Sequence, residues 1–162
     1  MSEEMLVVVN GRDEVLEYLP RSICHRPPYL MHREIFVVLF EGLEKVWLQK
    51  RSMQKEQWPG RWTVTASGHV AKGQSYLDAA KRELVEEVGV EAVLKKSVKF
   101  VSKLVENRAM IQVFTGVYMG GFVLDGKEVD EVRSYEKSEL EKMRDKLTPA
   151  AEKCLKMLKL LN

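Results

Sequence analysis

Three glutamates in one short segment carry the first chemical signal in the sequence. Residues 75–88 have the period of an amphipathic helix, because the apolar residues recur every three or four positions, at Leu77, Ala80, Leu84 and Val88. On such a helix Glu83, Glu86 and Glu87 stand at i, i+3 and i+4, so their carboxylates share one face, roughly opposite the apolar one. Oxygen ligands of this kind suit a hard divalent cation such as Mg²⁺, which commonly bridges to substrate phosphates.

The same acids also have a simpler interpretation as an ordinary solvated face of a helix. Arg82 and Glu86 form an i,i+4 pair of opposite charge, which is typical of an exposed helix surface. Glu83 and Glu87, however, form a like-charged i,i+4 pair, which costs roughly 0.2–0.5 kcal/mol unless something positive lies between them. A divalent cation would reverse the sign of that interaction. The acids alone leave both interpretations open.

The spacing around the acids resembles the Nudix box, G-x5-E-x7-R-E-U-x-E-E-x-G-U, in which U is apolar. The segment from Gly68 to Val90 reads GHVAKGQSYLDAAKRELVEEVGV and covers about a seventh of the chain. It departs from the pattern at one fixed position, where Gln74 replaces a glutamate. The chain is therefore similar to Nudix hydrolases.

The resemblance implies a metal-dependent hydrolase that cleaves a phosphoanhydride in a nucleoside diphosphate derivative or a similar diphosphate compound. In such an enzyme water attacks phosphorus while metal ions neutralise the phosphoryl charge, and a carboxylate accepts the proton. By position in the motif, Mg²⁺ or Mn²⁺ is implied at Glu83, Glu86 and Glu87, with the backbone carbonyl of Gly68 as a further ligand. Glu83 and Glu86 are the two candidates for the general base, a role that varies within the family.

Gln74 is expected to weaken the support of the site without abolishing it. In relatives the glutamate at this position pairs with the arginine matching Arg82 and supports the loop. The amide oxygen of Gln74 can still accept a hydrogen bond from Arg82, but the bond loses its charge assistance.

The flanking sequence, from about Cys24 to Val90, is similar to the branch of the family that includes isopentenyl-diphosphate isomerase and its hydrolase-like relatives. In the isomerase, histidines matching His25, His32 and His69 bind a metal, and these are the three histidines of this chain. Without the resemblance, a lone histidine beside proline or glycine is more commonly a loop or hydrogen-bonding residue. A second metal site at the histidines is therefore one of two open interpretations.

Basic residues matching Arg51 and Lys55 hold the diphosphate in the isomerase, and both types suit that task, although either is also ordinary on a surface. Two positions argue against isomerase activity. Ser67 stands where the isomerase has its essential cysteine, and a hydroxyl is a far weaker acid than a thiol. In Glu106-Asn107-Arg108, arginine takes the place of the second of two required glutamates. A hydrolase is favoured, with an isomerase-like enzyme or a non-catalytic nucleotide-binding sensor as alternatives.

Two tryptophans, Trp58 and Trp62, bracket a Pro59-Gly60 turn in the same region. One of them could stack on a nucleobase, whereas an aromatic side chain beside a turn is more commonly a core anchor. The sequence does not separate these roles.

The strands and helices that we expect around these residues indicate an α/β protein. Residues 6–19 predict a β-hairpin whose turn has positive φ at both Asn10 and Gly11. Strands are expected over 35–40, from Val46, before Gly68, over 98–105 and over 110–118. Helices are expected over 75–88, over 138–146, and from an N-cap Thr148 and N1 Pro149 onward.

The family resemblance implies that these elements form an α/β/α sandwich with a mixed central sheet. We expect residues 1–162 to form a single domain, in which residues 1–30 are an N-terminal hairpin extension and loop and residues 31–162 are the Nudix core.

The composition of the chain limits the kinds of binding partner that we expect. The 26 basic and 24 acidic residues nearly cancel, so a stable nucleic-acid complex is not expected, and no apolar stretch is long enough for a membrane span. The amino terminus lacks the pattern of a secretory signal, and Cys24 and Cys154 show no disulfide spacing, which together favour a cytoplasmic setting. The expected partner is a small diphosphate or nucleotide substrate, and the oligomeric state is left open.

Overall fold

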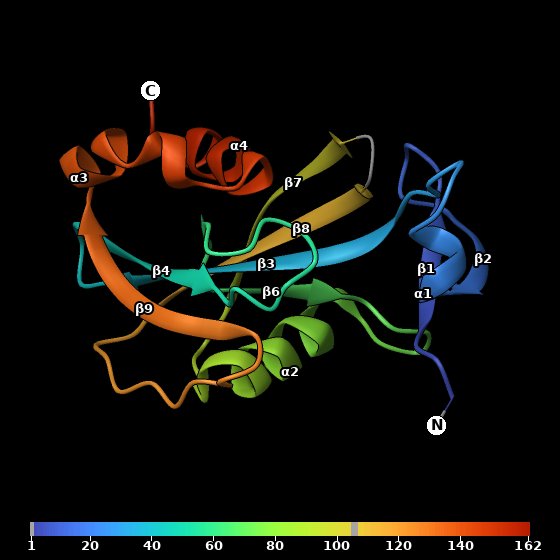
Figure 1. Cartoon of the computed structure of the whole chain (residues 1–162), viewed down its shortest axis with the longest axis horizontal. Helices are drawn as coiled ribbons and strands as arrows, with labels where there is room; N and C mark the ends of the chain where they lie inside the picture. Colours follow the sequence, from blue (N-terminus) through green and yellow to red (C-terminus); the bar gives the residue numbers. More distant parts are fainter. Residues whose placement is uncertain (1, 105–106) are drawn as a thin grey trace.

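A mixed sheet lies between two helical layers in the computed structural model, which describes residues 2–104 and 107–162 (Figure 1). The central strand β3 (His32–Glu41) pairs in parallel with β8 (Asn107–Val117) and antiparallel with β6 (Ala66–His69). Strand β7 (Lys95–Leu104) pairs antiparallel with the far side of β8. The predicted α/β/α sandwich with a mixed sheet is confirmed.

A second part of the sheet pairs with β3 only over a short stretch. Strand β4 (Lys45–Arg51) pairs with β3 only beside the turn that joins them, and then runs between β5 (Trp62–Thr63) and β9 (Val129–Glu136). The sequence did not predict β9, because only Val129 of this strand is buried and no apolar run marks it. The loop before β9 nevertheless contributes to the candidate site.

The two faces of β3 explain its long apolar run. Ile35, Val37 and Leu39 pack toward α2 (Tyr76–Val88), whereas Phe36 and Val38 pack toward the carboxyl-terminal helices. A strand that is covered on both faces carries a nearly continuous apolar sequence.

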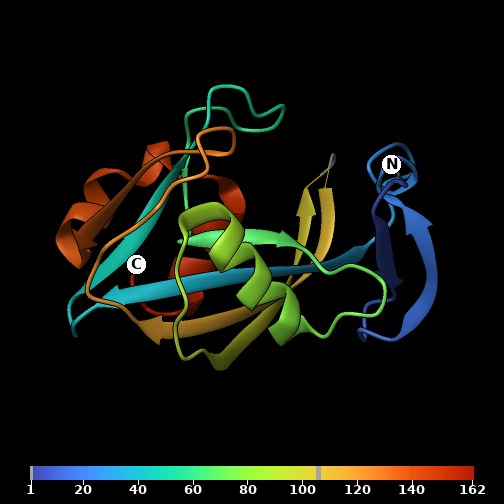
Figure 2. The same ribbon diagram turned by 90° about the horizontal axis from the view of Figure 1, so that it is seen from below.

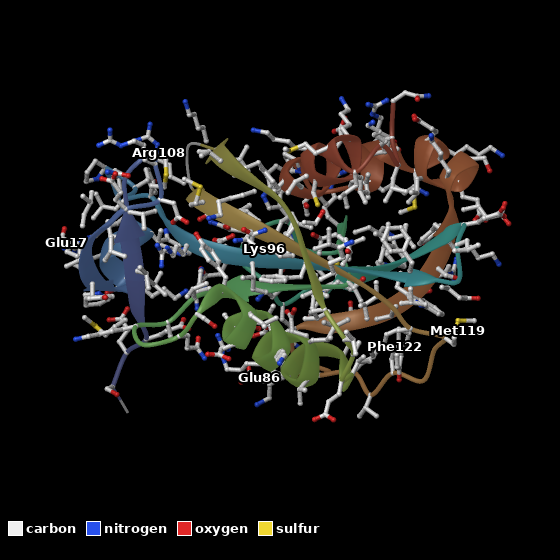
Figure 3. All side chains as sticks on the ribbon, turned by 180° about the vertical axis from the view of Figure 1, so that it is seen from behind. Glu17, Glu86, Lys96, Arg108, Met119 and Phe122 are labelled. Carbon is white, nitrogen blue, oxygen red and sulfur yellow. The ribbon has the colours of Figure 1, made fainter. Side chains whose placement is uncertain are left out.

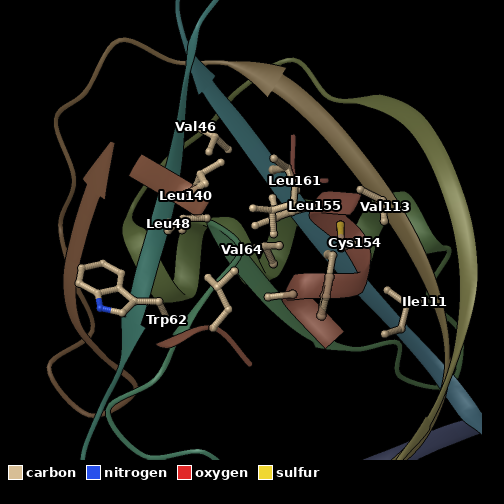
Figure 4. Packing of buried hydrophobic residues seen from close by; sticks show 14 of the residues in the cluster. Val46, Leu48, Trp62, Val64, Ile111, Val113, Leu140, Cys154, Leu155 and Leu161 are labelled. Atoms are coloured by element: carbon tan, nitrogen blue, oxygen red, sulfur yellow. The ribbon is translucent and has the colours of Figure 1, made fainter. Parts of the chain in front are cut away.

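The carboxyl-terminal layer consists of α3 (Lys137–Lys142), a 3₁₀ turn (Arg144–Lys146) and α4 (Pro149–Met157). The helix predicted over 138–146 is interrupted because Met143 turns into the core as the C-cap of α3. The cap predicted for the last helix is present. Figure 4 shows the core between this layer and the sheet, to which α4 and the segment after it contribute Cys154, Leu155 and Leu161. Among the described residues, no helix combines the length and the apolar character that a membrane crossing requires.

The amino-terminal hairpin, β1 (Met5–Val9) and β2 (Val15–Pro20), lies at one end of the sheet and is followed by the short helix α1 (Arg21–Cys24) (Figure 1). The predicted hairpin is confirmed, but its predicted tight turn is wrong. Positive φ occurs at Asp13 (62°) and not at Asn10 or Gly11. The loop is wider because the Asn10 side-chain oxygen accepts hydrogen bonds from the backbone N–H groups of Arg12 and Glu14.

Asp13 also fastens the hairpin to the rest of the domain. Its carboxylate accepts hydrogen bonds from Arg33 Nε (2.8 Å), the Tyr76 hydroxyl (2.8 Å) and Lys99 Nζ (2.6 Å). These partners come from β3, α2 and β7, so a single partly buried carboxylate joins the extension to three core elements.

Candidate functional site

A cavity of about 370 Å³ opens where α2, β6 and the loops after β4 and before β9 come together. Nine of the residues proposed from the sequence line it: His25, Arg51, Lys55, Gly68, His69, Arg82, Glu83, Glu86 and Glu87. The other two contact residues that line the cavity. His32 is fully buried, and its ring lies beside those of His25 and His69. Gln74 contacts Arg82 from the loop before α2.

The orientation of α2 differs from the expected one. Glu87 faces the sheet and is only 6% exposed, whereas Leu77, which was expected to face inward, is 36% exposed. The sheet-facing positions of the helix are filled partly by the small residues Ala79 and Ala80. Glu87 can be buried because Ser67 N–H (2.8 Å) and Gln49 Nε2 (3.3 Å) donate to its carboxylate.

The three glutamates occupy different environments. Glu87 is buried, Glu83 is partly buried with its side chain 13% exposed, and Glu86 is 56% exposed on the outer side of α2 (Figure 3). The sequence pattern placed them on one helix face opposite the apolar residues, but the rotation of the helix distributes them from the interior to the surface. Glu83 and Glu87 therefore point into the cavity wall, and Glu86 reaches its rim.

Burial shapes the acidity of the inner two carboxyls. It raises the pKa of Glu83 to about 7, although the hydrogen bond and charge of Arg82 act in the opposite direction. Burial likewise raises the pKa of Glu87 well above its usual range, with further increases from the negative charges of Glu83 and Glu128. The cluster is thus short of positive charge, and an oxygen-only donor set with this deficit fits a hard divalent cation.

Gly68 allows Glu83 to lie directly against β6. A Cβ atom at position 68 would overlap the Glu83 carboxyl group and would stand 2.6 Å from its Cγ atom. Any larger residue would displace Glu83. The glycine is required for close approach of the side chain to the strand, since its φ is not in the left-handed region.

Arg82 joins the acids to the loop that precedes α2. Its Nη1 donates to Glu83 (2.7 Å) and Glu86 (3.1 Å), and its Nη2 donates to the His69 carbonyl (3.0 Å) and to Gln74 Oε1 (3.3 Å). The structure therefore contains the Arg82–Glu86 surface pair and the Gln74–Arg82 hydrogen bond considered from the sequence.

The two basic residues expected to hold a diphosphate are already engaged within the protein. Arg51 donates from Nε and Nη2 to the Gln57 carbonyl at 3.1 and 2.9 Å, and Lys55 Nζ lies 3.5 Å from Glu128. Glu128 is a cavity residue that the sequence analysis missed. Its only sequence signal is the polar turn at 125–127, because the strand that follows it was not predicted.

The three histidines form a compact cluster beside the cavity, which His25 and His69 line. Their ring centroids are 5.0 to 5.2 Å apart, and one ring nitrogen from each lies within 4.8 Å of the others. Glu34, which the sequence analysis missed, lies beside them, with Oε1 at 3.1 Å from His32 Nε2 and 3.6 Å from His69 Nε2. The Nε2 atom of His25 is buried and has no hydrogen-bond partner in the described part of the chain.

The histidine cluster combines a neutral imidazole with an ionised carboxylate. Burial, together with the neighbouring histidines, lowers the pKa of His25 to about 4. Burial alone would raise the pKa of Glu34, but the hydrogen bond from His32 and the nearby histidine charges lower it to about 2. Glu34 is therefore an ionised carboxylate near a neutral imidazole with an unused nitrogen, a donor set that suits a metal with mixed nitrogen and oxygen ligands.

The segment 106–108, which bears on isomerase chemistry, is only partly described. Glu106 lies outside the described residues. Asn107 donates a hydrogen bond to Glu34 (3.1 Å), whereas Arg108 is exposed (Figure 3). Ser67 lines the cavity, where its backbone N–H is bonded to Glu87.

Comparisons with known proteins agree with this geometry. Residues 30–158 match the model of the NUDIX domain. An uncharacterized Nudix hydrolase of Pseudomonas aeruginosa is 34% identical over 131 residues, which are 80% of this chain and 77% of that protein. An isopentenyl-diphosphate Delta-isomerase of Serratia proteamaculans is 30% identical over 155 residues, which are 93% of this chain and 85% of that protein.

Solved structures share the fold. The crystal structure of DR0079 from Deinococcus radiodurans superposes with a TM-score of 0.83 at 20% identity, covering 95% of this chain and 98% of that one. The NUDIX domain of Shewanella oneidensis NrtR, complexed with ADP ribose, superposes with a TM-score of 0.65 at 14% identity and covers 87% of this chain and 97% of that one.

Proposed function

The chain belongs to the Nudix hydrolase family, and from that premise we propose that it cleaves a phosphoanhydride in a nucleoside diphosphate derivative or a similar diphosphate compound, with a divalent cation as cofactor. One observation carries the proposal. Carboxylates from α2 and two basic residues, one at the end of β4 and one in the loop after it, line one cavity, as a site that holds both a metal and a diphosphate requires.

Glu83, Glu86 and Glu87, with the carbonyl of Gly68, would hold Mg²⁺ or Mn²⁺. The fit rests on the charge deficit that raises the pKa values of Glu83 and Glu87, and on a donor set made of oxygen atoms alone. When bound, the ion supplies positive charge at the phosphoryl oxygens and lowers the pKa of water.

The remaining steps belong to the protein's own side chains. Glu83 is our first candidate for the general base, because its carboxyl lines the cavity and is oriented there by the hydrogen bond from Arg82. Glu86 is the second candidate, and pH–rate profiles of Glu83→Gln and Glu86→Gln separate them. Arg82 positions both acids, and Gln74 supports Arg82.

Lys55 and Arg51 would contact the diphosphate. The 3.5 Å distance between Lys55 and Glu128 is long for an ion pair and leaves the ammonium group able to turn toward an anion. Arg51 lines the same cavity while it holds the loop through Gln57.

The test is chromatographic detection of the phosphomonoester or phosphate products formed from a panel of nucleoside diphosphates, nucleotide sugars, ADP-ribose and isoprenoid diphosphates, with Mg²⁺ or Mn²⁺. We expect Glu87→Gln to abolish turnover, because it removes the most buried carboxylate. Glu91→Gln is the matched control, since Glu91 is an exposed acid just beyond the same helix. Equal rates in the wild type and Glu87→Gln would refute the proposed metal site.

A second candidate site is supported by one specific observation, the buried and unpartnered Nε2 of His25. We propose that His25, His32 and His69 hold a second metal ion, with Glu34 as a further ligand. Metal content after dialysis against Zn²⁺ or Mn²⁺ tests this. Loss of one equivalent in His25→Gln, with the equivalent at the glutamates retained, is expected, and unchanged content would refute the site.

An isomerase-like activity is the alternative proposal, because the Serratia proteamaculans relative is an isopentenyl-diphosphate Delta-isomerase. Ser67 and the exposed Arg108 disfavour it, because neither supplies the proton chemistry that the reaction needs. Deuterium exchange from solvent into isopentenyl diphosphate would revive it. Tight nucleotide binding without turnover of any compound would instead favour a non-catalytic sensor.

We propose that residues 1–162 act as one domain in which residues 1–30 complete the cavity, because Glu4 and His25 both line it. A cytoplasmic setting is proposed from the two cysteines, which are buried and free. The proposed partner is a small diphosphate or nucleotide.

A further inference from the structure

Trp58 differs from the other two tryptophans, all of which the structure describes. Trp62 is 8% exposed and packs edge-on against Tyr135, and Trp47 donates from its indole N–H to the Tyr118 carbonyl. Trp58 is 41% exposed and is the tryptophan that lines the cavity. A large aromatic side chain at the wall of a polar cavity has an unused flat face.

The backbone at Trp58 is held in an unusual conformation. Its φ of 52° lies in the left-handed region, which is a genuine outlier for a bulky residue. Such strain persists only where the surroundings fix it, and it is concentrated at ligand-binding sites. Here the surroundings are hydrogen bonds from Arg61 N–H to the Trp58 carbonyl (3.3 Å) and from Gly60 N–H to the Arg51 carbonyl (3.0 Å).

The side chain of Arg51 completes this clamp through its two hydrogen bonds to the Gln57 carbonyl, one residue before Trp58. A second contact fixes the loop from its other side, where Ser52 N–H donates to the Glu128 carbonyl (3.0 Å). Figure 2 shows this loop, between β4 and β5, projecting from the sheet beside the loop that leads into β9. The indole is thus carried by a loop whose backbone is held by hydrogen bonds at several points.

The other lining residues indicate which group would meet the indole. Beside Trp58, the apolar residues among the described lining are Phe36, Leu104 and Ala150, and Phe36 is only 5% exposed. An alkyl chain needs a pocket lined mainly by apolar side chains, and this cavity is lined mainly by polar ones. A nucleoside suits it better, because the base stacks on an aromatic face while the ribose and the base edges bond to polar groups.

We propose that Trp58 is a stacking platform for a nucleobase, and that the cavity therefore selects nucleoside diphosphate derivatives over aliphatic diphosphates. This inference rests on the proposed function, since it assumes that the diphosphate lies near Lys55. Lys55 and Trp58 belong to the same loop and line the same cavity, so one substrate can contact both.

The test measures binding by calorimetry, with adenosine 5′-diphosphate, inorganic pyrophosphate and isopentenyl diphosphate as probes. The proteins are the wild type, Trp58→Ala, Trp58→Phe and Tyr18→Ala. Tyr18 is the matched control, because it is also 41% exposed but lies on the hairpin away from the cavity lining. Melting temperatures show whether each variant is folded, and Trp58→Phe keeps an aromatic face if Trp58→Ala proves unstable.

We expect Trp58→Ala to weaken adenosine 5′-diphosphate binding by about 5- to 150-fold, the range that stacking of one base supplies. Pyrophosphate binding should stay unchanged, Trp58→Phe should retain most of the affinity, and Tyr18→Ala should match the wild type. Binding of the nucleotide should also quench the tryptophan fluorescence of the wild type, and this quench should be lost in Trp58→Phe.

Three outcomes would overturn the inference. Equal losses for adenosine 5′-diphosphate and pyrophosphate in Trp58→Ala would show that Trp58 only supports the loop. Unchanged nucleotide binding would show that the base lies elsewhere, and a greater loss for isopentenyl diphosphate would assign the indole to an aliphatic group. The proposed hydrolysis fails separately, if nucleotides bind through Trp58 but no compound is turned over.

Discussion

The pKa of Glu83 makes the stability of the metal-free protein depend on pH in a way that one substitution removes. Burial raises the pKa of this carboxyl to about 7 in the folded chain, against an ordinary value of 4.5. Between these two values the Glu83 carboxyl binds more protons in the folded state than in the unfolded state, so its own contribution to stability is greatest below pH 4.5 and is lost as the pH rises through 7. At 1.36 kcal/mol per pKa unit, the loss amounts to about 3 kcal/mol.

Glu83→Gln removes the titration while it keeps an oxygen that can accept from Arg82. We expect wild type and variant to be about equally stable near pH 4.5, and the variant to be more stable by about 3 kcal/mol at pH 8. The gain would be larger if loss of the Glu83 charge also lowers the pKa of Glu87, which that charge raises.

Urea unfolding at pH 4.5, 6 and 8, with divalent metal chelated, measures the difference directly. Glu91→Gln is the control, because Glu91 is an exposed acid that does not line the cavity. A difference between wild type and Glu83→Gln that stays constant with pH, or that favours the wild type as the pH rises, would refute the assignment of a raised pKa. Added Mn²⁺ at pH 8 should then stabilise the wild type more than the variant, because the metal binds the folded state.

Three further substitutions test local features of the site. Gly68→Ala places a methyl group on the Glu83 carboxyl and should lower kcat about a hundredfold in the assay of product formation, as small misplacements of catalytic groups do; an unchanged kcat would contradict the packing argument. Gln74→Glu gives Arg82 a charged acceptor and should raise the same rate by less than about a hundredfold, since the neutral bond already exists; a larger gain would mean that glutamine disables the site. Gly89→Ala forces a left-handed residue (φ 68°) to carry a side chain and should lower the free energy of unfolding in urea by about 1–3 kcal/mol; a smaller effect would show that the helix end relaxes.

The sequence predicts those features that local chemistry determines. Helix α2 ends where Gly89 takes the left-handed conformation, and α4 begins at the Thr148 cap with proline after it. The buried strand β3 follows from its unbroken apolar run. The Nudix box gives the spacing of the acids, because that spacing is a property of the helix alone.

The remaining features depend on tertiary contacts that no local pattern records. The rotation of α2 could not be deduced from periodicity, since Ala79 and Leu77 compete for the inner face and only packing decides between them. Glu34 directly precedes the apolar run of β3 and resembles a surface position, yet His32 and His69 lie against it. Glu128 enters the cavity because β9 pairs with β4, and a half-exposed strand leaves little trace in sequence.

The parallel pairing of β3 with β8 determines when the site can form during folding. The pair joins His32 to Ala109 and continues to Phe40 and Val117, so the segment that contains α2 must close as a long loop (Figure 1). Contacts of this sequence separation slow folding, because the entropy of loop closure is lost before the strands gain their pairing energy. We expect a nascent chain that ends before β8 to hold the acidic helix without a finished cavity, so assembly of the site depends on synthesis of the carboxyl-terminal third of the protein.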